Sequence, residues 1–175
     1  VTYSNLYFRE PESRADQTRM MSIVTTGAET GYYVDVFRSR KEKGGDKMHD
    51  YFYHNLGQTL TLTAADGSDL NLQSTEELAF AGAHLYAYSY LYDKKVAATN
   101  KDVKATFTID MKDKDGDDIY MNLWMKGEPD REVFTALAPM TEGLSRTPNM
   151  PYNIKEQPTL TFVARQHGEA WNRPF

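Results

Sequence analysis

The sequence has 175 residues, of which 40% are hydrophobic and 26% are charged, and this balance excludes a disordered chain and allows one domain with its own core. The formal net charge of −5 excludes a general attraction to nucleic acid or membrane lipid, so any anionic partner needs a local basic surface. The absence of cysteine excludes disulfides and thiol chemistry, and no apolar run reaches the ~20 residues that a membrane helix needs.

The first third of the chain predicts β-strands. Residues 18–38 contain two stretches of alternating side chains separated by GAETG, and this pattern predicts a hairpin. The charged, glycine-containing residues 41–47 predict a loop. HDYFYH (49–54) predicts a strand, in which alternate side chains point to opposite faces. One face then holds His49, Tyr51 and Tyr53, and the other holds Asp50, Phe52 and His54.

The same rhythm of short strands and turns continues to the end of the chain. Four tyrosines alternate strictly between positions 86 and 92, and this predicts a strand over 85–92 rather than a helix. Alternating apolar residues on both sides of DKDGDD predict a second hairpin. A final strand is predicted at TLTFVARQ (159–166).

These elements together predict the fold class. No amphipathic helix stands out, and 12 Tyr, 8 Phe and 2 Trp are typical of a β-rich protein. We therefore expect an all-β fold, an antiparallel β-sandwich that forms a single domain over residues 1–175. The chain starts without Met and stops at an apolar residue, so we expect a domain excised from a larger protein.

The acidic run KDKDGDD (112–118) raises the question of a calcium site. In an EF-hand loop glycine is the sixth residue, so Gly116 would place Met111 at the first position and Asn122 at the twelfth, where a carboxylate is needed. A hairpin turn at Asp-Gly explains the run more simply. We predict no metal site and no cofactor in this chain.

The basic segment between positions 38 and 47 is a candidate binding surface. Its cations stand out in an acidic chain, and they suit the carboxylate or sulfate groups of an acidic polysaccharide. The alternative is a solvated loop of mixed charge. The candidates for substrate binding here are Arg38, Arg40 and Lys41, with Lys43 and Lys47 nearby.

The histidine strand adds further candidates. His49 and His54 fall on opposite faces of a regular strand, which argues against a two-histidine metal site. His49 is the candidate catalytic residue, as a general acid or base, and Tyr51 and His54 are candidates for substrate binding. The alternative is a partly buried histidine that donates a hydrogen bond to a backbone carbonyl. Aromatic side chains suited to stacking on sugars, or simply to packing, are Tyr86, Tyr88, Tyr90, Tyr92, Trp124 and Trp171.

Two segments resemble a known family. YYVDVFRSRKEKGGDKMHDYFYHNLGQ (32–58) and VARQHGEAWNRPF (163–175) are similar to the C-terminal β-sandwich of heparinase II/III-like polysaccharide lyases. The matching positions in the first segment are Asp35, Arg38, His49, Asp50 and His54, and the segment departs from the pattern by the insertion-like RSRKEKGG.

The resemblance implies the later part of a lyase-type super-sandwich. Such enzymes cleave uronic-acid-containing polysaccharides, such as glycosaminoglycans, by β-elimination, and an α/α-toroid domain precedes the sandwich. Their principal catalytic residues lie in the toroid or in the first sandwich strands, so the resemblance implies that they are mostly outside this chain. It also implies a periplasmic or secreted bacterial protein with an acidic polysaccharide as its partner. None of the family's catalytic motifs is found in this chain. The alternative function is a non-catalytic carbohydrate-binding or scaffolding module.

Overall fold

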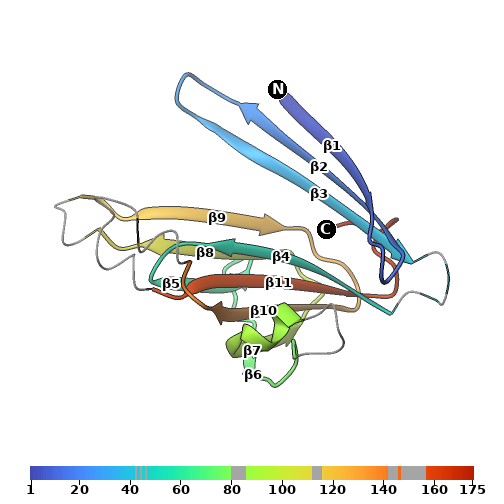
Figure 1. Ribbon diagram of the computed structural model, residues 1–175. Helices are drawn as coiled ribbons and strands as arrows, with labels where there is room; N and C mark the ends of the chain where they lie inside the picture. Colours follow the sequence, from blue (N-terminus) through green and yellow to red (C-terminus); the bar gives the residue numbers. More distant parts are fainter. Residues whose placement is uncertain are drawn as a thin grey trace. The chain divides into compact units, whose positions relative to one another are not determined.

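The computed structural model describes residues 1–41, 43, 45, 47–79, 86–111, 116–141, 146 and 157–175. These residues form β-strands and one short 3-10 helix (Figure 1). The strands are β1 (Thr2–Arg9), β2 (Ala15–Thr25), β3 (Gly31–Lys41), β4 (Met48–Asn55), β5 (Thr59–Ala64), β6 (Gln73–Ser74), β7 (Tyr92–Ala98), β8 (Val103–Ile109), β9 (Ile119–Met125), β10 (Arg131–Ala138) and β11 (Thr159–His167), and the helix is η1 (Tyr86–Tyr90).

The chain divides into two compact units. Unit 1 contains Val1–Tyr51 and Arg165–Phe175, and unit 2 contains Phe52–Ala164. The boundaries fall inside β4 and β11, so each of these strands contributes residues to both units. No helix in the described part of the chain is long and apolar enough to cross a membrane.

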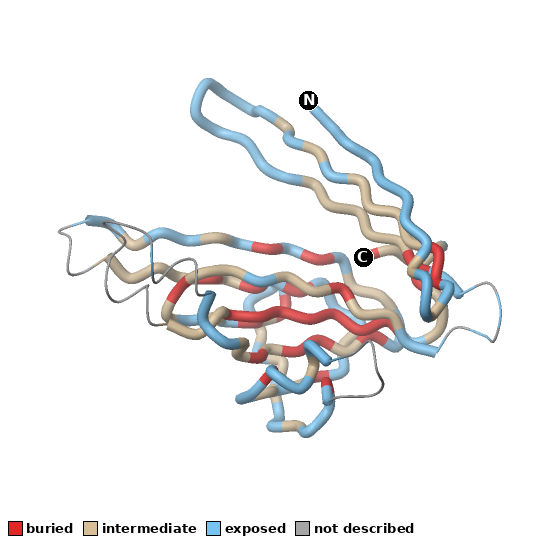
Figure 2. Tube along the Cα trace, viewed as in Figure 1, coloured by how far each residue is buried: buried red, intermediate tan, exposed pale blue. Residues whose placement is uncertain are grey.

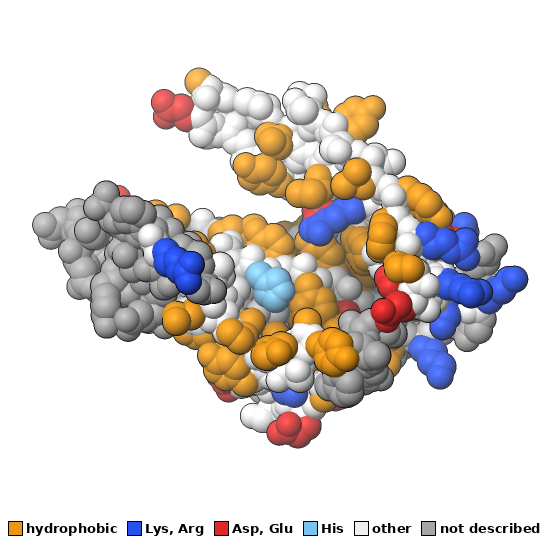
Figure 3. All heavy atoms as spheres, in the orientation of Figure 1, with side chains coloured by type: hydrophobic (Ala, Val, Ile, Leu, Met, Phe, Trp, Pro, Cys, Tyr) orange, Lys and Arg blue, Asp and Glu red, His pale blue; other side chains and the backbone are white. Residues whose placement is uncertain are grey.

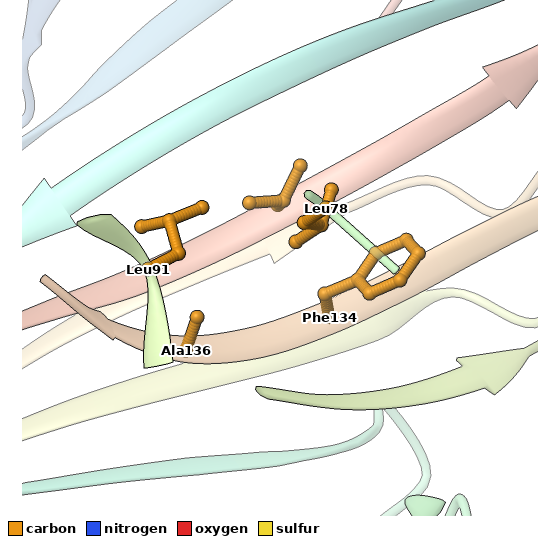
Figure 4. Packing of buried hydrophobic residues seen from close by; sticks show 5 residues of the cluster. Leu78, Leu91, Phe134 and Ala136 are labelled. Carbon is orange, nitrogen blue, oxygen red and sulfur yellow. The ribbon is translucent and has the colours of Figure 1, made fainter. Parts of the chain in front are cut away.

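Unit 2 is built on two sheets. One has the strand order β4-β11-β10-β7-β6, and the other has the order β5-β8-β9. Phe134 of β10 and Val163 of β11 pack with Leu78 and Leu91 on one face of the larger sheet (Figure 4). Val133, Phe162 and Ala164 are chain neighbours of these residues that point to the opposite face, and they are also fully buried. Because the middle of β10 and most of β11 are buried on both faces, apolar residues stand next to one another there, as in VF (133–134) and FVA (162–164), rather than alternating.

The smaller sheet covers the second face of the core. Phe107 of β8 is 1% exposed, and its ring lies 5.6 Å from the ring of Tyr53 in β4. Leu62 and Leu123 come from the flanking strands and are also buried. The prediction of an all-β antiparallel sandwich is confirmed.

The predicted strand over 85–92 is wrong. Residues Tyr86–Tyr90 form the 3-10 helix η1, and β7 begins only at Tyr92; Leu85 lies outside the described residues. A 3-10 helix has three residues per turn, so the alternating tyrosines cannot share a face. Tyr88 alone turns inward, with its ring edge 5.3 Å from the ring of Phe52, while Tyr86 and Tyr90 are exposed.

Both predicted hairpins are present. β2 pairs with β3 from Thr25↔Gly31 outward, and β8 pairs with β9 up to Ile109↔Ile119. Residues 112–115, which include the first three residues of the DKDGDD turn, lie outside the described residues. The strand over 49–54 and the strand over 159–166 are confirmed as β4 and β11.

Unit 1 contains a sheet that the sequence predicted only in part. β1, β2 and β3 form an antiparallel meander, and every residue of β1 is exposed (Figure 2). The last residues of the chain add to β3: Ser39 and Ala170 exchange two backbone hydrogen bonds, and so do Phe37 and Phe175. The end of the chain therefore closes the edge of β3.

Candidate functional site

Most of the predicted site residues lie in unit 1, where β3, β4 and the C-terminal segment come together. Arg38, Arg40 and Lys41 are on β3, and His49 and Tyr51 are on β4. His54 is also on β4 but belongs to unit 2. The contacts of each residue show which side chains are available to a ligand.

Tyr51 is a core residue of unit 1. It is 5% exposed, and its ring lies 5.8 Å from that of Phe175 in a stacked arrangement. Its hydroxyl donates a 2.9 Å hydrogen bond to Asp35 Oδ2. Arg19 Nε donates to the same carboxylate at 3.0 Å, and this bond raises the pKa of Arg19. The phenol is therefore committed to a buried polar cluster.

A buried ion pair lies on the neighbouring position of β4. Arg165 donates two hydrogen bonds to the Asp50 carboxylate, at 2.8 Å to Oδ1 and 2.9 Å to Oδ2. Each side chain is only 9% exposed. We did not predict Arg165 from the sequence. The signal was one Asp in β4 and one Arg in a β11 that is buried along most of its length, because a buried charge is rare unless it is paired.

His49 bonds to β3. Its Nδ1 lies 2.7 Å from the hydroxyl of Ser39, which is 2% exposed, while the His49 ring itself is half-buried. A hydroxyl can donate to this nitrogen or accept from it, so the contact holds the imidazole in place without selecting a tautomer. The side chain is therefore held in place, and part of it remains open to solvent.

The basic residues at the end of β3 differ in exposure. The Arg38 guanidinium donates to the carbonyl of Trp171. The Arg40 guanidinium lies 4.2 Å from the centre of the Trp171 ring, and its Nε is 3.7 Å from Asp16 Oδ2. Arg40 and Lys41 are nevertheless exposed, and Figure 3 shows Lys and Arg side chains gathered over this end of β3. Arg40 lies over one face of the Trp171 ring, so that face is not free for stacking.

His54 lies among unit 2 residues. Its Nδ1 is 2.9 Å from the hydroxyl of Thr161, which is fully buried, and its ring lies 5.9 Å from that of Phe52. Phe52 and His54 thus share one face of β4, as the alternation predicted. Partial burial lowers the pKa of His54, because a charged imidazolium would lose hydration there.

The next question is whether acidic and histidine side chains gather into a cation site. Among the described residues there is no group of three or more His, Cys, Asp or Glu side chains that could hold a metal ion. The candidate site is therefore a set of basic, hydroxyl and aromatic groups.

Comparison with known proteins relates the chain to the polysaccharide lyases. It is similar to a segment of the endo-acting ulvan lyase of Formosa agariphila, with 32% identity over 177 residues. This alignment covers 99% of the chain and 20% of the lyase, so the chain spans about one fifth of the curated relative that it matches. No protein-family model matches the chain. No solved structure matches it.

Proposed function

We propose that this chain is a β-sandwich domain of a polysaccharide lyase that cleaves a uronic-acid-containing polysaccharide by β-elimination. The observation that carries the proposal is the 32% identity to an ulvan lyase along 99% of the chain. Because the chain aligns with only 20% of that enzyme, we infer that most catalytic residues lie outside it. The domain then helps to build and position the site.

The contacts of the candidate residues support the inference that most catalytic residues lie outside this chain. A base that abstracts a proton must reach the substrate directly or through one water molecule. Tyr51 is buried and bonded to Asp35. The chain's other candidate base, His49, is bonded to Ser39. We infer that the phenol of Tyr51 maintains the fold, and we retain His49 as the one candidate catalytic residue in the chain.

The heparinase II/III-like assignment is our finer proposal. The two segments that carry the resemblance, residues 32–58 and 163–175, meet in unit 1 through the pairs Asp50 with Arg165, Ser39 with Ala170 and Phe37 with Phe175. Segments that contact each other in the fold constrain each other's residues. We therefore expect both segments, rather than one alone, to resemble the same family. We infer an upstream α/α-toroid domain and a periplasmic or secreted location, where a polysaccharide too large to enter a cell is met.

An acidic polysaccharide is the proposed partner. Arg40 and Lys41 are exposed cations at the end of β3, and they suit carboxylate or sulfate groups. His54 adds an exposed, bonded imidazole in unit 2. Ulvan is the first substrate to test, and a glycosaminoglycan and alginate are the next.

The test is the absorbance at about 232 nm that an unsaturated uronate gains in β-elimination. It compares this chain with the longer protein that we propose contains it, on ulvan, a glycosaminoglycan and alginate. A rise with the longer protein alone supports an accessory domain of a lyase. No rise with either protein on any of the three substrates contradicts the proposed function, and the non-catalytic alternative then takes its place.

A further inference from the structure

The outer face of the sheet β5-β8-β9 has a composition that packing does not explain. Along β8, the buried residues Val103, Ala105 and Phe107 point into the core, so the residues between them point outward. The same alternation holds on β5 and β9. We name this outward surface the threonine face, and it consists of Thr59, Thr61, Thr63, Lys104, Thr106, Thr108, Tyr120, Asn122 and Trp124.

Strand register arranges this face in rows across the three strands. The middle row is Thr61, Thr106 and Asn122, in which the Thr106 hydroxyl donates a 2.9 Å hydrogen bond to Asn122 Oδ1. The rows on either side each end in an aromatic residue of β9. One is Thr59, Thr108 and Tyr120, and the other is Thr63, Lys104 and Trp124.

The two aromatic rings are exposed and lie on the same strand. Trp124 is 60% exposed and Tyr120 is 57% exposed. Residues four apart on a strand are separated by about 13 Å along it, so the rings flank Asn122 over the length of a short oligosaccharide. Exposed aromatics combined with hydroxyl and amide groups suit a ligand that has apolar C–H faces and many hydroxyls.

The charge of the face is positive and is concentrated at one end. Lys104 is the charged residue of the threonine face, it is exposed, and it pairs with Trp124 in the strand register. In the described part of the chain no ion pair or hydrogen bond engages its side chain. At the other end, the Tyr120 hydroxyl donates to Asp118 Oδ2 at 3.3 Å, and the Asp118 charge raises the pKa of Tyr120.

We propose that the threonine face binds a stretch of acidic polysaccharide. Sugar rings stack on Trp124 and Tyr120, and sugar hydroxyls bond to Asn122 and the threonines. A carboxylate or sulfate pairs with Lys104, at the end remote from Asp118. The choice of an acidic glycan rests on the proposed function, whereas the stacking rings and the hydroxyl rows belong to the sheet itself.

The test is native-gel electrophoresis of the chain through gels that contain ulvan, alginate or neutral hydroxyethyl cellulose. We expect ulvan to retard the chain, and we expect Trp124→Thr and Tyr120→Thr each to weaken binding by roughly tenfold, since stacking is lost while a strand-forming residue is kept. Lys104→Gln is expected to weaken binding to the acidic glycans alone. The matched control is Tyr3→Thr, which removes an exposed tyrosine (73%) from strand β1 of unit 1, outside this face.

Two results would overturn the inference: retardation that survives Trp124→Thr, or an equal loss in the Tyr3→Thr control. If Trp124→Thr fails to fold, the unaltered binding surface is tested by fluorescence. The sequence has 2 Trp, so Trp171→Phe leaves Trp124 as the one indole reporter. A change in its emission with ulvan supports binding at the face, and constant emission contradicts it.

This test and the test of the proposed function fail separately. Binding of ulvan by the chain without any absorbance rise from the longer protein would support the threonine face and contradict the lyase. An absorbance rise from the longer protein without retardation of the chain in any gel would support the lyase and contradict the face.

Discussion

The buried ion pair of Asp50 and Arg165 is expected to contribute strongly to the stability of unit 1. Their two hydrogen bonds are short, and both side chains are 9% exposed. Removing one partner of a buried pair leaves the other charge without compensation in a poorly hydrated place, which typically costs about 3–5 kcal/mol. We therefore expect Asp50→Asn to lower the free energy of unfolding by about that amount, measured by urea denaturation.

The control for this prediction is an exposed pair. Lys101 and Asp66 are 3.5 Å apart, with side chains 53% and 63% exposed, and Lys101→Gln is expected to cost about 1 kcal/mol or less. Equal losses in the two variants would show that burial does not strengthen the dependence on Asp50.

His54 predicts a pH dependence of stability. Burial lowers its pKa below the ordinary value of 6.5, so the unfolded chain takes up a proton at a higher pH than the folded chain does. The stability contributed by neutral His54 is therefore present above pH 6.5 and is lost as the pH falls through the lowered pKa. In His54→Asn the amide retains a polar partner for Thr161 but does not titrate.

The measurement for His54 is urea unfolding between pH 7.5 and about 5. We expect the free energy of unfolding to fall less steeply in His54→Asn than in the unaltered chain. The same slope in both proteins would assign the acid sensitivity to other groups.

The variant His49→Ala distinguishes a catalytic role of His49 from a role in packing. If it contributes to the lyase site, His49→Ala in the longer protein lowers turnover on ulvan while the melting temperature of unit 1 changes little. The reverse result, a large fall in melting temperature with normal residual turnover, would assign His49 to packing through Ser39. A Ser39→Ala control removes the hydroxyl partner and leaves the imidazole.

At the scale of elements, the turn between β4 and β5 depends on Gly57. Its φ of 141° is rarely adopted by other residues, and a Cβ there would lie 2.5 Å from the carbonyl oxygen of Thr108. We expect Gly57→Ala to lower the free energy of unfolding by about 2–4 kcal/mol, from backbone strain and steric overlap together. Thermal or urea unfolding measures the loss.

A second glycine provides the matched comparison. Gly67 has a φ of 86°, but a Cβ there would have no atom within 4 Å, so Gly67→Ala should cost only the backbone strain, about 1 kcal/mol. If both variants lost the same stability, the contact with Thr108 would not matter.

The alternation of side chains along the sequence predicted some elements correctly and others wrongly. β4 was predicted because its alternation is a property of neighbouring residues, and the Phe52–His54 ring contact follows from it. The tyrosines over 86–90 alternate equally well, yet they form η1. In η1 the packing of Tyr88 against the core cluster that includes Leu91 outweighs β propensity. The alternation of neighbouring residues does not indicate such a contact, because its partners come from other parts of the chain.

For the whole molecule, burial predicts an uneven distribution of stability. Residues Leu160 to Gln166 of β11 are buried, whereas every residue of β1 is exposed and β1 is an edge strand with one neighbour. We expect backbone amides of β1 to exchange with deuterium faster than those of β11 by roughly tenfold or more. Peptide-resolved hydrogen exchange measures this, and equally slow exchange in both strands would contradict it.

The sandwich class was predictable, but the assembly of the candidate site was not. Strand rhythm and aromatic content were enough to predict an all-β fold. The partners Asp50 and Arg165 are 115 positions apart, and Arg38 bonds to Trp171 from 133 positions away. Such pairings follow from the order of strands in a sheet, which depends on the whole chain rather than on any window of it.

The division of the chain into units has a consequence for biosynthesis. Unit 2 is one continuous segment, Phe52–Ala164, whereas unit 1 needs both Val1–Tyr51 and Arg165–Phe175. A ribosome therefore synthesises all of unit 2 before the second piece of unit 1. Until that piece is made, β3 lacks its Ala170 and Phe175 backbone partners and Asp50 of β4 lacks its partner Arg165, so unit 1 is completed only after unit 2.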